Sequence, residues 1–138
     1  MDLASNQANL EADFRFPSGP WTGFFLQPPH VKRHWMDLTL TFKDSTIRGT
    51  GHDWVGDFLI TGRYELDSGK CWWTKRYIDK HDVSYQGYAE EKGIWGTWEI
   101  PPAWRGGFHI WPKATGGPGD DKLQEAIEMP QLVGATVR

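Results

Sequence analysis

The 138-residue sequence contains a single cysteine, Cys71, which excludes an internal disulfide framework and a cysteine-rich zinc site. No apolar run approaches the roughly 20 residues that span a bilayer, so no transmembrane helix is expected. Lys and Arg number 15 against 18 Asp and Glu, and a formal charge of -3 argues against binding to nucleic acid. Residues 1–18 lack the basic start and apolar stretch of a signal peptide, so we expect a cytoplasmic protein without a membrane partner.

Aromatic residues, in contrast, are abundant: the chain has 9 Trp, 7 Phe and 4 Tyr. It also has 16 Gly, and with them the apolar share is normal for a folded domain. The length fits one domain. An aromatic-rich single domain is the first indication of a binding function.

Between Gly19 and Pro112 the sequence consists of short runs of alternating apolar and polar residues, separated by Gly, Asp and Pro. Such runs are typical of antiparallel strands that are joined by tight turns. The predicted strands are Trp21–Gln27, His34–Phe42, Thr46–His52, Val55–Glu65, Cys71–Ile78, Val83–Ala89, Ile94–Ile100 and Gly107–Trp111.

Glycines recur inside these strands, and Gly51 and Gly62 are examples. Glycine within a strand suits sharp coiling and the close approach of a ring. Eight short strands with no long helix between them most simply close into a barrel, because closure removes exposed sheet edges. We therefore predict an all-β fold, a single eight-stranded antiparallel up-and-down barrel over residues 19–112. Its interior can hold one small ligand or be filled by side chains.

The two ends of the chain differ from this central part. Residues 1–18 are largely polar, and we expect a flexible lead-in. Residues 113–138 start with a glycine-rich linker, followed at 120–128 by an N-capping residue and a narrow apolar stripe, and then by a terminating proline, Pro130. These features predict a short helix in a C-terminal tail, which must dock on the barrel or on a neighbouring subunit.

Several short segments resemble those of a known family. They are Ile60-Thr61-Gly62-Arg63-Tyr64, Trp73-Thr74-Lys75-Arg76-Tyr77, Tyr85-Gln86-Gly87-Tyr88 and Ile94-Trp95-Gly96-Thr97-Trp98. Their order and spacing resemble the middle strands of the avidin and streptavidin barrels. The opening Gly19-Pro20-Trp21 is similar to the Gly-x-Trp start of the wider calycin group, which includes the lipocalins. The resemblance implies an eight-stranded meander barrel, commonly oligomeric, with a ligand at its open end.

The resemblance carries over only part of that family's biotin site. Trp73 and Trp98 match tryptophans of its walls, and Tyr85 stands where another wall tryptophan would be. The family's polar residues, an asparagine, a serine, a tyrosine and a serine, would fall on Gly23, Gln27, Gly51 and Asp53. Unpaired buried polar groups cost about 1–3 kcal/mol each, so biotin is not the expected ligand.

We predict a small-molecule site in the barrel lumen. Its candidate residues are Trp21, Gln27, Asp53, Trp73, Lys75, Tyr85 and Trp98. The rings would supply contact area, and the three polar side chains would orient the ligand from the rim. The alternative is a closed core, because large aromatic residues bury well whatever their purpose. Lys75 and Asp53 have inward parity, where a core would hold apolar residues, which favours the site unless the two form a mutually satisfied pair at the barrel mouth.

Four further tryptophans have outward parity or uncertain positions: Trp35, Trp72, Trp95 and Trp111. Outward tryptophans predict a covered exterior, either a homo-oligomer contact or the docked tail. The alternative is that they are scattered exposed rings.

Catalytic and metal-binding patterns are scarce. His52 and Asp53 would lie on opposite faces of a regular strand, so they form no ready acid–base couple. The histidines lack the spacing of a metal site, and Cys71 has no basic neighbour that would clearly make it a thiolate. A haem held by His109 or His52 is a less favoured alternative, and no cofactor is expected.

The sequence thus favours non-covalent binding of a small, partly aromatic or apolar molecule in the lumen. A protein-interaction module with a filled barrel is the second hypothesis. A small isomerase-like or cyclase-like enzyme, which would work by positioning alone, is the third.

Overall fold

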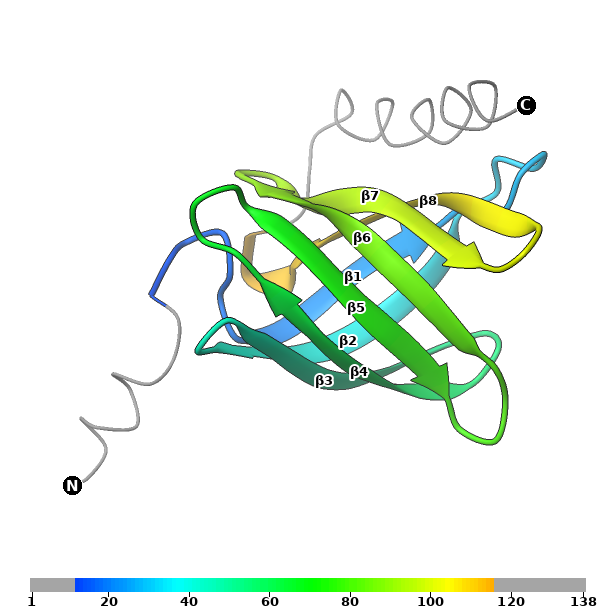
Figure 1. The fold of residues 1–138 in the computed structure, drawn as a ribbon, viewed down its shortest axis with the longest axis horizontal. Helices are drawn as coiled ribbons and strands as arrows, with labels where there is room; N and C mark the ends of the chain where they lie inside the picture. Colours follow the sequence, from blue (N-terminus) through cyan, green and yellow to red (C-terminus); the bar gives the residue numbers. More distant parts are fainter. Residues whose placement is uncertain (1–11, 116–138) are drawn as a thin grey trace.

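The computed structural model describes residues 12–115, which form one closed antiparallel β-barrel (Figure 1). Its strands are β1 (Gly19–Phe25), β2 (His34–Lys43), β3 (Thr46–Asp53), β4 (Asp57–Tyr64), β5 (Lys70–Tyr77), β6 (Asp82–Glu90), β7 (Gly93–Ile100) and β8 (Trp104–Pro112). Each strand pairs with its neighbours in sequence, and β8 closes the barrel against β1. The predicted fold class is confirmed. A 3-10 turn, Lys113–Thr115, follows β8, and the predicted C-terminal helix lies outside the described residues.

The alternation of apolar and polar residues decides which side chains face the interior. In β2 the buried residues are Met36, Leu38, Leu40 and Phe42, and each is followed by a more exposed residue. β6 alternates in the same way along its whole length. Because the side chains of a strand point to opposite faces in turn, one face of every strand lines the interior.

Two in-strand glycines show why the barrel tolerates so many large rings. Gly51 is paired with Phe58 across β3 and β4, and a Cβ atom at Gly51 would lie 2.6 Å from the Phe58 ring. Gly62 is paired with Trp73, and a Cβ atom there would overlap the Trp73 backbone and Cβ. The predicted close approach of a ring to glycine is therefore observed at Gly51, whereas Gly62 makes room for the backbone and Cβ of Trp73.

The barrel end at which β3, β5 and β7 begin is filled with side chains, and we call it the closed end. Phe16, from the lead-in, is fully buried there, with its ring centroid 4.6 Å from that of Tyr64 and 5.4 Å from that of Phe42. The Trp21 indole N–H donates to the carbonyl of Pro17 at 2.8 Å. The lead-in therefore contributes a core residue, which its polar composition did not indicate.

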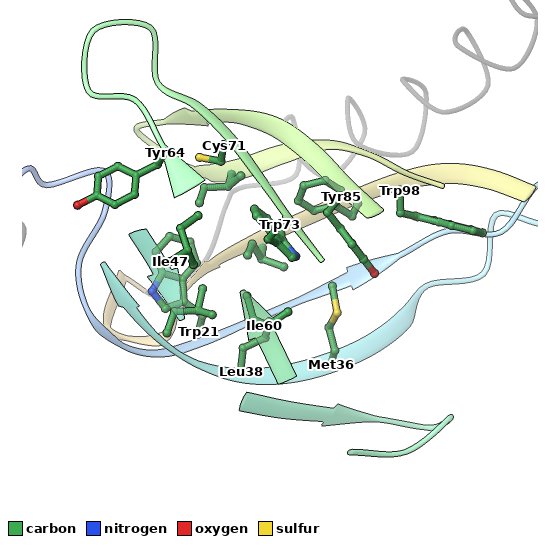
Figure 2. Close-up of a cluster of buried hydrophobic side chains, with 14 of the residues drawn as sticks. Trp21, Met36, Leu38, Ile47, Ile60, Tyr64, Cys71, Trp73, Tyr85 and Trp98 are labelled. Carbon is green, nitrogen blue, oxygen red and sulfur yellow. The ribbon is translucent and has the colours of Figure 1, made fainter. Parts of the chain in front are cut away.

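The buried interior runs from this end toward the other. Figure 2 shows Tyr64, Cys71 and Trp21 at one end of the row and Met36, Tyr85 and Trp98 at the other. In the described part of the chain, no helix has the length and apolar character that a membrane crossing needs.

A second apolar cluster lies outside the barrel interior. It consists of Phe24, Leu26, Trp95 and Trp111, all buried. Trp35 lies beside it, with 52% of its surface exposed and its ring 6.0 Å from that of Trp111. Three of the four tryptophans expected to have outward parity or uncertain positions therefore gather on one part of the exterior, whereas Trp72 is half-buried elsewhere.

Candidate ligand-binding site

The opposite end of the barrel, which we call the open end, holds a cavity of about 540 Å³. The loops at this end are residues 26–33, 54–56, 78–81 and 101–103. The aromatic residues lining the cavity are Phe25, Trp54, Tyr77, Tyr85, Trp98 and Trp104. The other lining residues are Gln27, Val55, Lys80, His81, Val83 and Ile100. The lining is mostly apolar with a few polar groups, which is typical of small-molecule sites.

Trp98 forms a fixed wall of this cavity. Its indole N–H donates to the carbonyl of Leu26 at 2.8 Å, and its ring packs edge-on against Phe25, with 6.1 Å between the centroids. Gly106 is paired with Trp98 across β7 and β8, and a Cβ atom there would lie 2.7 Å from the indole nitrogen. The glycine therefore makes room for the ring at this position.

Two exposed tryptophans stand at the mouth. Trp54, on the β3–β4 connection, and Trp104, the first residue of β8, are 69% and 53% exposed although both line the cavity. The Trp54 ring lies 5.8 Å from that of His34, which in turn stacks on Phe25 at 5.0 Å. Apolar surface of this kind, exposed at the rim of a cavity, is typical of a ligand entrance.

A buried polar network lies behind the inner wall of the cavity. The Lys75 Nζ atom is 2.6 Å from the Asp53 Oδ2 atom, and these two side chains are 1% and 0% exposed. The Tyr77 hydroxyl donates to the same Oδ2 atom at 2.6 Å, and Lys75 donates to the Tyr85 hydroxyl at 3.2 Å. Tyr77 and Tyr85 line the cavity, whereas Lys75 and Asp53 do not. The charged groups of Lys75 and Asp53 are therefore linked to the cavity by their hydrogen bonds to the two tyrosines.

Asp53 has a second, structural contact. Its Oδ1 atom accepts a hydrogen bond from the Val55 backbone N–H at 2.9 Å, which fixes the turn that carries Trp54. A buried carboxylate such as Asp53 is tolerated when it accepts several hydrogen bonds and is paired with a cation.

Aromatic rings surround the Lys75 ammonium. Its Nζ atom lies 4.5 Å from the Phe58 centroid, 4.7 Å from that of Phe25 and 4.8 Å from that of Tyr77. Burial lowers the pKa of Lys75 to about 8, although Asp53 opposes the shift. Ring faces and the carboxylate together stabilise the cation, so it is mostly charged near neutral pH.

The tyrosines of the network keep their protons. Burial, followed by the charge and hydrogen bond of Asp53, raises the pKa of Tyr77. Burial and then Asp53 raise that of Tyr85. Both phenols are therefore neutral at any physiological pH, and they can act as hydrogen-bond donors.

The structure brings only part of the predicted site together. Gln27, Tyr85 and Trp98 line the cavity, while Trp73 lies against its inner wall and stacks on Tyr85 with 5.4 Å between centroids and 10° between planes. Trp21 lies at the closed end, with its ring 5.6 Å from that of Phe42.

The two remaining predicted residues differ from the expected arrangement. Asp53 and Lys75, expected at the rim, lie buried beneath the cavity as a mutually satisfied pair, the arrangement that the sequence analysis left open for the mouth.

Several lining residues were missed by the sequence analysis. Tyr77 shares the inward parity of Trp73 and Lys75 on β5, and this parity was sufficient to find it. Trp54 and Trp104 belong to or adjoin loops, where period-two alternation carries no information about direction.

Groups with metal or redox chemistry do not gather at this site. Among residues 12–115, no three His, Cys, Asp or Glu side chains are arranged to hold a metal ion. Cys71 is buried toward the closed end, and burial raises the pKa of its thiol to about 12. A thiol with that pKa is not a nucleophile at neutral pH.

Comparison with known proteins identifies no relative of this chain. No protein-family model, no curated protein and no solved structure matches the chain significantly. The closed eight-stranded barrel is consistent with a calycin-like fold, and the closer resemblance to avidin and streptavidin stays a prediction.

Proposed function

We propose that this protein binds a small, partly aromatic or apolar molecule, non-covalently, in the cavity at the open end. The observation that carries this proposal is a cavity of about 540 Å³ at the mouth of a barrel whose other end is filled. Cavities that bury small ligands commonly measure about 300–1,000 Å³. The filled barrel of the alternative hypothesis describes the closed end but not the open one.

The polar groups that would orient the ligand are few. Tyr85 and Gln27 line the cavity, and Lys80 and His81 stand at its exposed rim. Asp53 and Lys75 act through the tyrosines, not by direct contact.

An avidin-like strand plan is part of the same proposal, but biotin is not the proposed ligand. A Cβ atom at Gly23 would overlap the backbone of His109, and one at Gly51 would lie 2.6 Å from Phe58. Two of the four positions that correspond to the family's polar set therefore have no room for a side chain. The ligand must be recognised by a different polar pattern.

The test compares two valine variants. Val55→Trp places a large ring in the cavity lining, whereas Val31→Trp adds the same ring at a 48% exposed loop position outside the lining. A library of mono- and bicyclic aromatic compounds is screened by ligand-observed NMR. We expect compounds that bind the wild type and Val31→Trp and are displaced from Val55→Trp. Absence of any binder at about 1 mM, or equal binding to both variants, contradicts the proposal.

We also propose that copies of the chain associate through the outward tryptophans. Trp35 supports this, because it is half-exposed beside the buried rings of Phe24 and Trp111. Analytical ultracentrifugation of Trp35→Ser tests it. Trp104→Ser is the control, because Trp104 is a similarly exposed tryptophan that does not belong to the Phe24–Trp111 cluster. Trp35→Ser is expected to shift the protein toward monomer. A wild type that is monomeric at all concentrations, or a Trp35→Ser variant with unchanged mass, contradicts it.

A further inference from the structure

The two tyrosines of the cavity wall present opposite hydrogen-bonding polarity. The Tyr77 hydroxyl donates its proton to Asp53, so only its oxygen lone pairs remain for a ligand. The Tyr85 hydroxyl accepts from Lys75, because an ammonium group has donors and no acceptor. The proton of Tyr85 is therefore directed elsewhere.

No protein acceptor takes that proton in the described part of the chain, where Lys75 is the hydrogen-bond partner of the Tyr85 hydroxyl. Tyr85 is only 3% exposed, and it lines the cavity. Figure 2 shows its hydroxyl on the side of Trp98 and Met36, toward the open end. A buried donor without an acceptor is unfavourable, so a group that accepts its proton would be bound preferentially.

We propose that Tyr85 is the specificity-determining donor of this cavity, and that the ligand carries a neutral hydrogen-bond acceptor, such as a carbonyl, at its inner end. This inference rests on the proposed binding function and names the class of ligand that the site takes.

The ring of Tyr85 is held in place for this role. It stacks on Trp73 at 5.4 Å and meets the edge of Phe108 at 4.9 Å. The Lys75 ammonium at 3.2 Å polarises the hydroxyl and makes it a stronger donor. A donor whose direction is fixed by packing before the ligand arrives costs little ordering entropy on binding.

Charge balance selects a neutral acceptor over an anionic one. The positive charge of Lys75 is paired with Asp53 at 2.6 Å, which leaves no uncompensated cation at the inner wall. A ligand carboxylate at Tyr85 would also approach the Asp53 carboxylate through the same network. Burying such a charge without a counter-ion is costly, whereas a carbonyl gains the hydrogen bond alone.

The experiment uses three probes with one carbon frame: indane, 1-indanone and indane-1-carboxylate. Their dissociation constants for the full chain are measured by ligand-observed NMR at about pH 6.5, where Lys75 is charged. The wild type is expected to bind 1-indanone about tenfold more tightly than indane and to bind the carboxylate more weakly than 1-indanone. Tyr85→Phe is expected to bind indane and 1-indanone equally.

Tyr77→Phe is the matched control, since it removes the same atom from a neighbouring cavity residue. In the wild type the Tyr77 hydroxyl donates its proton to Asp53. The Tyr77→Phe variant is therefore expected to be less stable than the wild type and still to prefer 1-indanone over indane. Near-ultraviolet circular dichroism establishes that both variants are folded.

The outcomes separate the two proposals. If neither indane nor 1-indanone binds the wild type, the result contradicts the proposed function and, with it, the inference about Tyr85. Binding of indane without a preference for 1-indanone overturns the inference and leaves the function standing. A preference for the carboxylate, or a preference for 1-indanone that survives in Tyr85→Phe, also overturns it.

Discussion

The closed and open ends of this barrel follow the same strand pattern but use it differently. At the closed end, Phe16 from the lead-in joins Phe42 and Tyr64 in an apolar plug. At the open end, the interior positions of β3 and β5 carry Asp53 and Lys75 beneath a cavity. Inward parity therefore indicates burial at both ends, but the presence of a plug decides whether the space is filled.

The difference suggests that the closed end stabilises the barrel and that the open end binds the ligand. Stability is concentrated at the closed end, where ring packs against ring, because removal of apolar surface from water is the dominant stabilising term. The Lys75–Asp53 ion pair at the open end is weak evidence for stability, since a buried ion pair has a large desolvation cost. Its value lies in holding Tyr77 and Tyr85 in fixed directions at the cavity wall.

The largest expected effect is at the plug. Phe16→Ala removes a fully buried ring and should lower the free energy of unfolding by about 3–5 kcal/mol in urea titrations. Phe14→Ala is the control, because Phe14 belongs to the same lead-in and is 73% exposed, so a change within about 0.5 kcal/mol is expected. Equal effects of the two substitutions would show that the lead-in does not close the barrel.

The next effect is at the polar network. Asp53→Asn leaves the buried Lys75 cation without its counter-ion and should cost about 3 kcal/mol of unfolding free energy. The double variant Asp53→Asn/Lys75→Met should regain most of this loss, because it removes the unpaired charge. Asp82→Asn, which breaks the exposed pair with Arg76, should change stability little. A double variant less stable than Asp53→Asn would contradict the assignment of a buried charged pair.

The smallest effect is a dependence on pH. The folded-state pKa of Lys75, about 8, lies below its ordinary value of 10.5, so between these values the unfolded chain binds more protons than the folded one. Stability should therefore rise with pH in this window, by about 1 kcal/mol from about pH 7.5 to about pH 9. Urea titrations should show the rise in the wild type and lose it in Asp53→Asn/Lys75→Met. A flat or falling wild-type curve would contradict the lowered pKa.

The sequence was most informative where side chains alternate along a strand. Parity placed Tyr85, Trp98 and Lys75 inside the barrel, and the structure has them there. Parity does not encode position along the barrel axis, and this is why Trp21 was assigned to the site although it lies at the other end. Parity also gives no side-chain direction in loops, so it did not identify Trp54 as a residue that lines the cavity.

The sequence by itself determined the strand number, the inward faces and an interior rich in rings, because a period of two and the residues of tight turns are local properties of the chain. Tertiary structure alone decided which end is open, that Phe16 closes the other, and that Lys75 and Asp53 pair beneath the cavity and do not reach its rim. These features depend on strand register and on contacts between residues far apart in the chain, which local pattern does not fix.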